Sequence, residues 1–91
     1  MAITFAASAS KHRISSDRAR YVIENCACPL YPPPNADDDE EDLVVFLGPD
    51  DRGVPLEVVA VELANGDCLV IHAMRLRRKY VADYARVMEC R

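Results

Sequence analysis

The sequence lacks the features that define several large classes of protein. It contains no run of about 18 apolar residues, which a membrane-spanning helix would need. Its only three glycines, Gly48, Gly53 and Gly66, all fall where the pattern predicts turns, so there is no glycine-rich phosphate loop. A catalytic-serine motif, a paired-carboxylate signature and internal repeats are also absent. These absences exclude most enzymes that use a nucleotide cofactor.

The length of 91 residues predicts one small domain, residues 1–91, with a single core. The share of charged residues, 29%, is ordinary for a folded soluble protein. The first ten residues, MAITFAASAS, lack the basic segment and the continuous apolar run of a signal peptide. We therefore expect a cytoplasmic protein.

The cysteines are Cys26, Cys28, Cys68 and Cys90. Only the first two are close, and one residue separates them, whereas structural zinc sites usually use pairs separated by roughly two to four residues. The two histidines complete no recognisable ligand pattern. We therefore expect reduced, mostly structural thiols and no metal or other cofactor. A metal site built from Cys26, Cys28 and a histidine is the alternative.

Charge is segregated along the chain, although the net charge is only -4. Residues 31–51 carry eight Asp/Glu and no Lys/Arg, whereas residues 72–91 carry six Lys/Arg and two Asp/Glu. Such separation shapes a local field even when the total is unremarkable. The basic end therefore suits the binding of a polyanion. The acidic, proline-rich stretch at 31–42 is expected to be a solvated loop.

The first third of the chain predicts one short strand followed by helices. Residues 3–5 are a strand candidate, and residues 6–12 are small and compatible with a helix. Ser15 or Ser16 is placed to cap a second helix, which should end near Asn25 because prolines follow. The apolar stripe of that helix consists of Ala19, Val22 and Ile23.

The rest of the chain predicts a three-stranded meander and a final helix. Apolar, β-branched runs at 43–47, 56–63 and 68–74 indicate strands, and Asn65-Gly66 between the last two is the best hairpin signal. Residues 78–88 show helical spacing of apolar side chains. We therefore expect an α+β fold, a small antiparallel sheet packed by helices in the order β-α-α-β-β-β-α.

Two basic segments carry the residue types that metal-independent RNA cleavage needs. That reaction requires a base for the 2′-hydroxyl, an acid for the leaving oxygen and cations for the charged phosphate. The candidate catalytic residues are His72, His12, Lys79 and Tyr80, and the candidate RNA-binding residues are Lys11, Arg13, Arg75, Arg77 and Arg78. His72 ends a predicted strand, so its direction should be defined. The alternatives are a hydrogen-bonded structural His72 and a Tyr80 that packs on the sheet.

Both basic segments resemble parts of a known protein family. KHRISSDRA at 11–19 resembles the KHGVSFEEA-type segment of BrnT-like toxins, with Arg13 in place of the glycine. IHAMRLRRKY at 71–80 lies where that family has an I-S-A-R segment and then a basic, tyrosine-containing stretch. His72 and Met74 stand in place of its serine and arginine.

The resemblance implies the toxin of a bacterial type II toxin–antitoxin pair with a RelE-like ribonuclease fold. Such a protein would act on mRNA without a metal and would be silenced by a cognate protein antitoxin. The alternative is a non-enzymatic module that binds protein or nucleic acid through the basic edge at 72–80.

Overall fold

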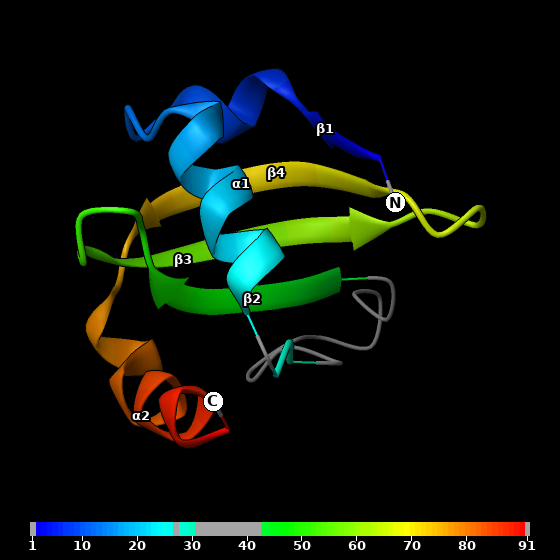
Figure 1. The fold of residues 1–91 in the computed structure, drawn as a ribbon. Helices are drawn as coiled ribbons and strands as arrows, with labels where there is room; N and C mark the ends of the chain where they lie inside the picture. The colour runs from blue at the N-terminus through cyan, green and yellow to red at the C-terminus, as the bar shows by residue number, and fades with distance from the viewer. Residues whose placement is uncertain (1, 27, 31–42, 91) are drawn as a thin grey trace.

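The fold is built on a four-stranded mixed sheet with strand order β1-β4-β3-β2 (Figure 1). The computed structural model describes residues 2–26, 28–30 and 43–90, so the predicted acidic loop at 31–42 lies outside the described residues. Two α-helices pack with the sheet, which confirms the expected α+β class.

Three strands form the predicted antiparallel meander: β2 (Leu43–Pro49), β3 (Pro55–Glu62) and β4 (Cys68–Arg75). The hairpin between β3 and β4 turns at Asn65-Gly66, as predicted. Gly66 adopts φ 87°, a conformation that glycine tolerates without steric cost. Gly48 was expected in a turn, but this prediction is wrong. Gly48 belongs to β2 and packs against Val22.

The first strand, β1 (Ile3–Phe5), pairs with β4 in parallel, with Phe5 opposite Val70. The sheet is therefore mixed and not wholly antiparallel. The helix expected at 6–12 is only a short 3-10 turn, η1 (Ala7–Ser10), which has no side-chain cap. A four-residue turn closes too few hydrogen bonds to extend as an α-helix. The predicted order with two helices before the meander is thus not observed.

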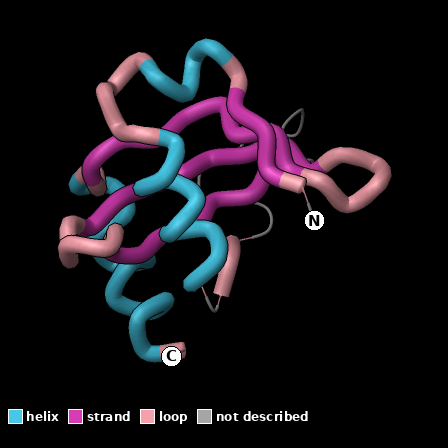
Figure 2. The backbone as a smooth tube through the Cα atoms, turned by 45° about the horizontal axis from the view of Figure 1, so that its top comes forward, coloured by secondary structure: helices cyan, strands magenta, loops and turns pink. Residues whose placement is uncertain are grey.

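Helix α1 (Ser16–Asn25) crosses one face of the sheet (Figures 1 and 2). The Ser15 side chain accepts a hydrogen bond from the Arg18 amide at 3.2 Å, which confirms the predicted N-cap. The predicted stripe of Ala19, Val22 and Ile23 is buried against alternate residues of the strands. Burial of this stripe, and not intrinsic propensity, fixes a helix of only ten residues.

A smaller apolar cluster forms with the opposite face of the sheet. Its buried members are Val45, Leu47, Tyr80 and Val87. The last two come from η3 (Arg78–Tyr80) and α2 (Val81–Glu89), which together replace the single helix predicted at 78–88. No helix in the described part of the chain is long and apolar enough to cross a membrane.

A disulfide joins Cys28 to Cys90, which contradicts the expectation of reduced thiols. The two residues are 62 positions apart, but the fold brings the end of α2 over the segment that follows α1, with 6.3 Å between their Cα atoms. Cys26 and Cys68 are not part of a disulfide. This pairing could not be predicted from the sequence, because the spacing of the cysteines does not report which segments meet in space.

Removing this disulfide should lower the free energy of unfolding by roughly 4 kcal/mol, the usual cost for a closed loop of this length. Urea unfolding of the wild type, with and without reductant, measures this difference. The double variant Cys28→Ser, Cys90→Ser serves as the control, because its unfolding should not respond to reductant. An equal response of both proteins would show that the bridge does not form in solution.

Candidate functional site

A bulge in β4 turns His72 onto the same face of the sheet as Glu57. Val59 lies opposite His72, but the next residue of β3, Ala60, lies opposite Val70, so Ile71 is an extra residue in β4. In a regular strand, residues 70 and 72 share a face, so His72 would lie on the α1 face beside Val70 if β4 had no bulge. Bulges often redirect a side chain in this way.

Glu57 is fully buried and is the centre of a charged network. Its carboxylate accepts hydrogen bonds from the backbone amide, Nε and Nη2 of Arg77, at 2.8 to 3.1 Å for the first two and 2.7 Å for the last. The Nε2 atom of His72 lies 3.3 Å from Oε2 of the same carboxylate. A buried carboxylate is tolerated only with such partners.

His12 reaches this network from the other end of the chain. Because β1 runs parallel to β4, the residues after Phe5 follow the second half of β4, and Ser8 donates to the Ile71 carbonyl at 2.8 Å. The chain then turns at Arg13, whose φ is 61°, before α1 begins. The rings of His12 and His72 consequently meet edge to face, with 5.4 Å between their centroids.

Burial is the main reason why the pKa of His72 lies below its ordinary value of 6.5. The Glu57 carboxylate opposes this effect, whereas the positive charge of Arg77 and the nearby His12 add to it. The His72 imidazole is therefore neutral near pH 7. The hydrogen bonds to Glu57 raise the pKa of Arg77, which stays charged.

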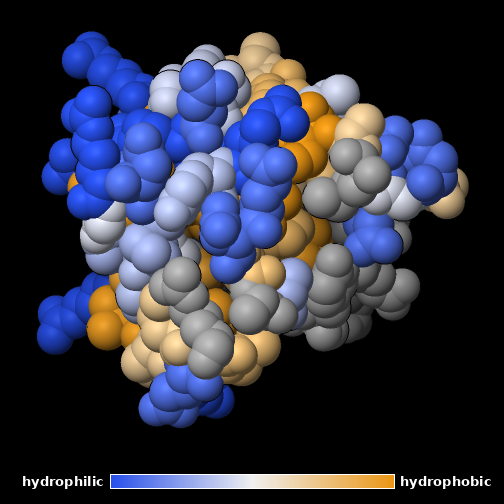
Figure 3. Space-filling view, viewed as in Figure 1, coloured by the Kyte–Doolittle hydropathy of each residue, from blue (hydrophilic) through white to orange (hydrophobic). Residues whose placement is uncertain are grey.

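The other predicted cations lie near the two histidines in the sequence and are not buried. Lys11, Arg13, Arg75, Arg78 and Lys79 are all exposed. Figure 3 shows hydrophilic side chains gathered over the connection between η1 and α1, the segment that holds the first two of them. Exposed Lys and Arg side chains are the usual contacts of nucleic-acid phosphates.

Tyr80 and Arg77 are engaged within the protein, and for Tyr80 this agrees with the alternative of a residue that packs on the sheet. The side chain of Tyr80 is 4% exposed and packs in the smaller cluster, and this burial favours a packing role. Arg77 and Lys79 both lie over its ring, with 5.8 and 5.1 Å to the ring centroid. Arg77 is held mainly by Glu57, so its first role is within the protein.

Glu57 is the residue that sequence reasoning missed. It interrupts an otherwise apolar strand, and such a position could have been read as a buried charge that requires a partner. Its partners lie 15 and 20 residues further along the chain, so only the pairing of β3 with β4 identifies them.

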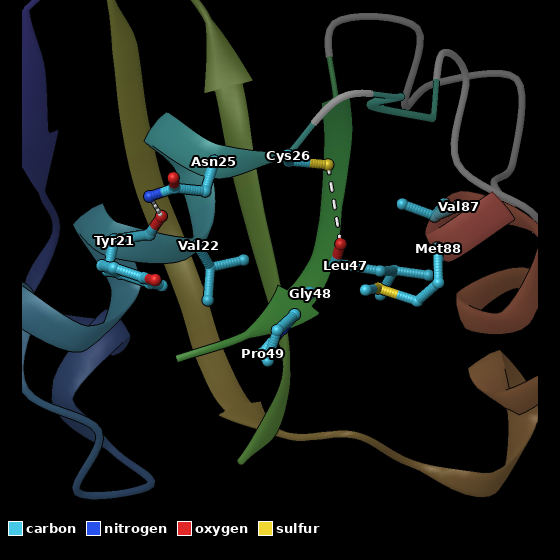
Figure 4. Close-up of a pocket in the computed structure, with 9 residues that line it drawn as sticks. All are labelled: Tyr21, Val22, Asn25, Cys26, Leu47, Gly48, Pro49, Val87 and Met88. Atoms are coloured by element: carbon cyan, nitrogen blue, oxygen red, sulfur yellow. Dashed lines mark hydrogen bonds between the residues drawn. The ribbon is translucent and has the colours of Figure 1, made fainter. Parts of the chain in front are cut away.

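Two other possible sites in the described residues have simpler explanations. A pocket between α1, β2 and α2 has a cavity volume of only about 10 Å³, room for about one water (Figure 4). The alternative metal site does not form, because Cys28 is bonded to Cys90. Within residues 2–26, 28–30 and 43–90, no group of three or more His, Cys, Asp or Glu side chains could hold a metal ion.

Comparison of the chain with protein-family models, curated proteins and solved structures found no match. The site is therefore interpreted from its own geometry.

Arg77→Ala should destabilise the fold by roughly 3 kcal/mol, because it removes the only positive charge bonded to the buried Glu57 carboxylate and leaves it the neutral His72 imidazole and a backbone amide. The lower end of the usual range applies, since the Arg77 side chain is 42% exposed. Chemical denaturation measures the change. Arg78→Ala is the matched control and should alter stability by less than about 0.5 kcal/mol. Equal effects of the two variants would contradict a structural role for the Glu57–Arg77 pair.

Stability should also depend on the protonation of His72. Its native pKa is below the unfolded value near 6.5, so below that pH the unfolded chain binds more protons than the native protein. The contribution of neutral His72 to the stability of the fold is complete above about pH 6.5, and it is lost as the pH falls through the native pKa of His72. Urea unfolding between about pH 5 and 8 should show this slope, and His72→Gln should flatten it. An unchanged slope in the variant would show that other groups cause it.

Proposed function

We propose that this protein is a metal-independent ribonuclease that acts on mRNA, the toxin of a bacterial type II toxin–antitoxin pair. The observation that carries the proposal is the contact of His12 with His72, at the edge of a network that buries Glu57. Two basic segments, 60 positions apart in the sequence, supply one residue each. Their meeting brings two imidazoles together, and exposed cations flank both histidines in the sequence.

The two histidines would divide the proton transfers of RNA cleavage. Neutral His72 would take the proton of the 2′-hydroxyl, and the 2′-oxygen would attack the phosphorus. The bond from phosphorus to the 5′-oxygen would break, and His12 in its protonated form would give that oxygen a proton. The products would be a 2′,3′-cyclic phosphate and a 5′-hydroxyl.

The exposed cations would hold the substrate and stabilise the charge that develops on the phosphate. Lys11 and Arg13 lie beside His12 in the chain, and Arg75, Arg78 and Lys79 follow His72. Arginine offers two parallel hydrogen bonds to a phosphate. Arg77 would contribute its charge from its position on Glu57, and Lys79 would be the additional candidate for a catalytic cation.

The backbone at Arg13 supports the family resemblance on which part of the proposal rests. Positive φ is uncommon for residues other than glycine, and Arg13 adopts 61° where the BrnT-like segment has glycine. The turn that glycine would favour is therefore retained here with a basic residue in its place. A RelE-like topology is part of the same proposal.

The proposed partner is a cognate protein antitoxin that would cover the exposed cations of the two basic segments and thereby exclude RNA. An acidic segment would match the exposed Lys and Arg side chains. The proposed location is the cytoplasm, where mRNA is available. Because the cytoplasm keeps most thiols reduced, the reduced protein must remain folded to act there.

The purified protein should cleave single-stranded RNA in the presence of a chelator. His72→Ala should lower the rate by about 10²–10⁴, the usual contribution of a positioned acid or base. Expression without an antitoxin should arrest growth, and the same variant should relieve the arrest. Gel analysis of the cleaved RNA and growth curves are the measurements.

RNA binding should be tested separately, with the double variant Arg75→Ala, Arg78→Ala. Each lost phosphate contact should reduce the salt slope of binding by about one unit. Arg86→Ala is the control, since it removes one exposed positive charge from α2, away from the strand end. Binding without cleavage by the wild type would favour the non-enzymatic module.

A further inference from the structure

We propose that His72 acts as the base through its Nδ1 atom and that Glu57 is the positioning residue that enforces this choice. The assignment rests on the proposed function, since it names the atom that would receive the proton. Neither the Glu57 partner nor the choice between the two ring nitrogens is visible in the sequence.

Arg77 contacts both oxygens of the Glu57 carboxylate. These oxygens accept hydrogen bonds from three nitrogens of Arg77, which is positively charged. A carboxylate in that setting is acceptor-only. The His72 Nε2 atom, 3.3 Å from Oε2, can therefore bond to it only as a donor. If Nε2 lacked a hydrogen, two acceptors would face each other.

The other ring nitrogen of His72, Nδ1, does not contact Glu57. A neutral imidazole with its hydrogen on Nε2 carries its lone pair on Nδ1. Nδ1 has no hydrogen-bond partner among the described residues, and no buried side-chain nitrogen or oxygen in that part of the chain lacks one. It follows that Nδ1 is not buried. The His72 side chain as a whole is 23% exposed, so the ring is fixed on one side and open on the other.

Burial and the neighbouring charges together set the charge state of His72. The titratable and charged groups that face His72 are Glu57 from β3, Arg77 after β4 and His12 after η1. A carboxylate alone would favour the imidazolium, but burial, the largest cause, and the positive charge of Arg77 both lower the pKa of His72. Arg77 also bonds the same carboxylate through its backbone amide, which fixes the direction of the carboxylate.

In the reaction, one proton moves from the 2′-hydroxyl to Nδ1 as the bond between the 2′-oxygen and phosphorus forms. The bond to the 5′-oxygen breaks, and that oxygen receives a proton from His12. His72 leaves the step as an imidazolium, whose charge the Glu57 carboxylate stabilises through Nε2–H. Glu57 itself gains no proton, so its role is that of a positioning residue.

The tautomer can be measured on the wild-type protein, without a variant that might unfold. Long-range heteronuclear NMR of the imidazole nitrogens, at a pH above the His72 transition, should show a protonated Nε2 and an unprotonated Nδ1. The opposite tautomer would overturn the proposal. This result does not depend on cleavage, so a wild type that cuts no RNA would reject the proposed function separately.

Two substitutions at His72 separate the hydrogen bond from the base. Glutamine places an amide N–H where Nε2 lies, whereas asparagine places one where Nδ1 lies. At about pH 7.5, where His72 is neutral, His72→Gln should keep the urea midpoint of the wild type but lose cleavage by about 10²–10⁴. His72→Asn should lose cleavage and also shift the midpoint, because Glu57 loses a donor. Cleavage retained by the glutamine variant would show that His72 only satisfies Glu57.

The pH dependence of cleavage tests the role of Glu57. Its charge raises the pKa of His72, so Glu57→Gln should lower that pKa and move the acidic limb of the rate profile to lower pH. A merely structural residue would reduce activity at every pH without moving the limb. Circular dichroism of the variant checks that it is folded, and an unmoved limb in a folded variant would contradict the proposal.

Discussion

The buried carboxylate of Glu57 is the constraint on which the rest of the site depends. An ionised group without solvent is unfavourable unless its hydrogen bonds are made by the protein. Here Arg77 and His72 supply them, and each of these residues is thereby held in one place. The need to neutralise one buried charge therefore fixes the end of β4, the chain that leads into η3, and the orientation of an imidazole.

The same interaction explains why the basic segment is not uniform. Arg77 is bonded to the buried Glu57 carboxylate, although its own side chain is 42% exposed, whereas Arg75, Arg78 and Lys79 are exposed. A cluster that is continuous in sequence thus contains one cation that neutralises a buried charge and several that do not. Substitution of Arg75, Arg78 or Lys79 therefore probes binding, whereas substitution of Arg77 also removes an ion pair and probes stability.

Local sequence patterns predicted much of the architecture. The capped helix with its stripe of Ala19, Val22 and Ile23 formed as expected, and so did the hairpin at Asn65-Gly66. These features depend on neighbouring residues. The parallel pairing of β1 and the disulfide from Cys28 to Cys90 did not appear in the patterns, because both join segments more than 60 residues apart. The helix expected at 6–12 is a 3-10 turn, since small residues there tolerate a helix without stabilising one.

The sequence by itself determined the class of fold, the strands of the meander, and the presence of two histidines within basic segments. Periodicity, capping and turn chemistry are local, so they can be read without coordinates. Only the tertiary structure decided that His12 meets His72, that the bulge at Ile71 turns His72 toward Glu57, and that Glu57 holds Arg77. These contacts depend on strand register and on compensation of a buried charge, and both arise only when distant segments pack together.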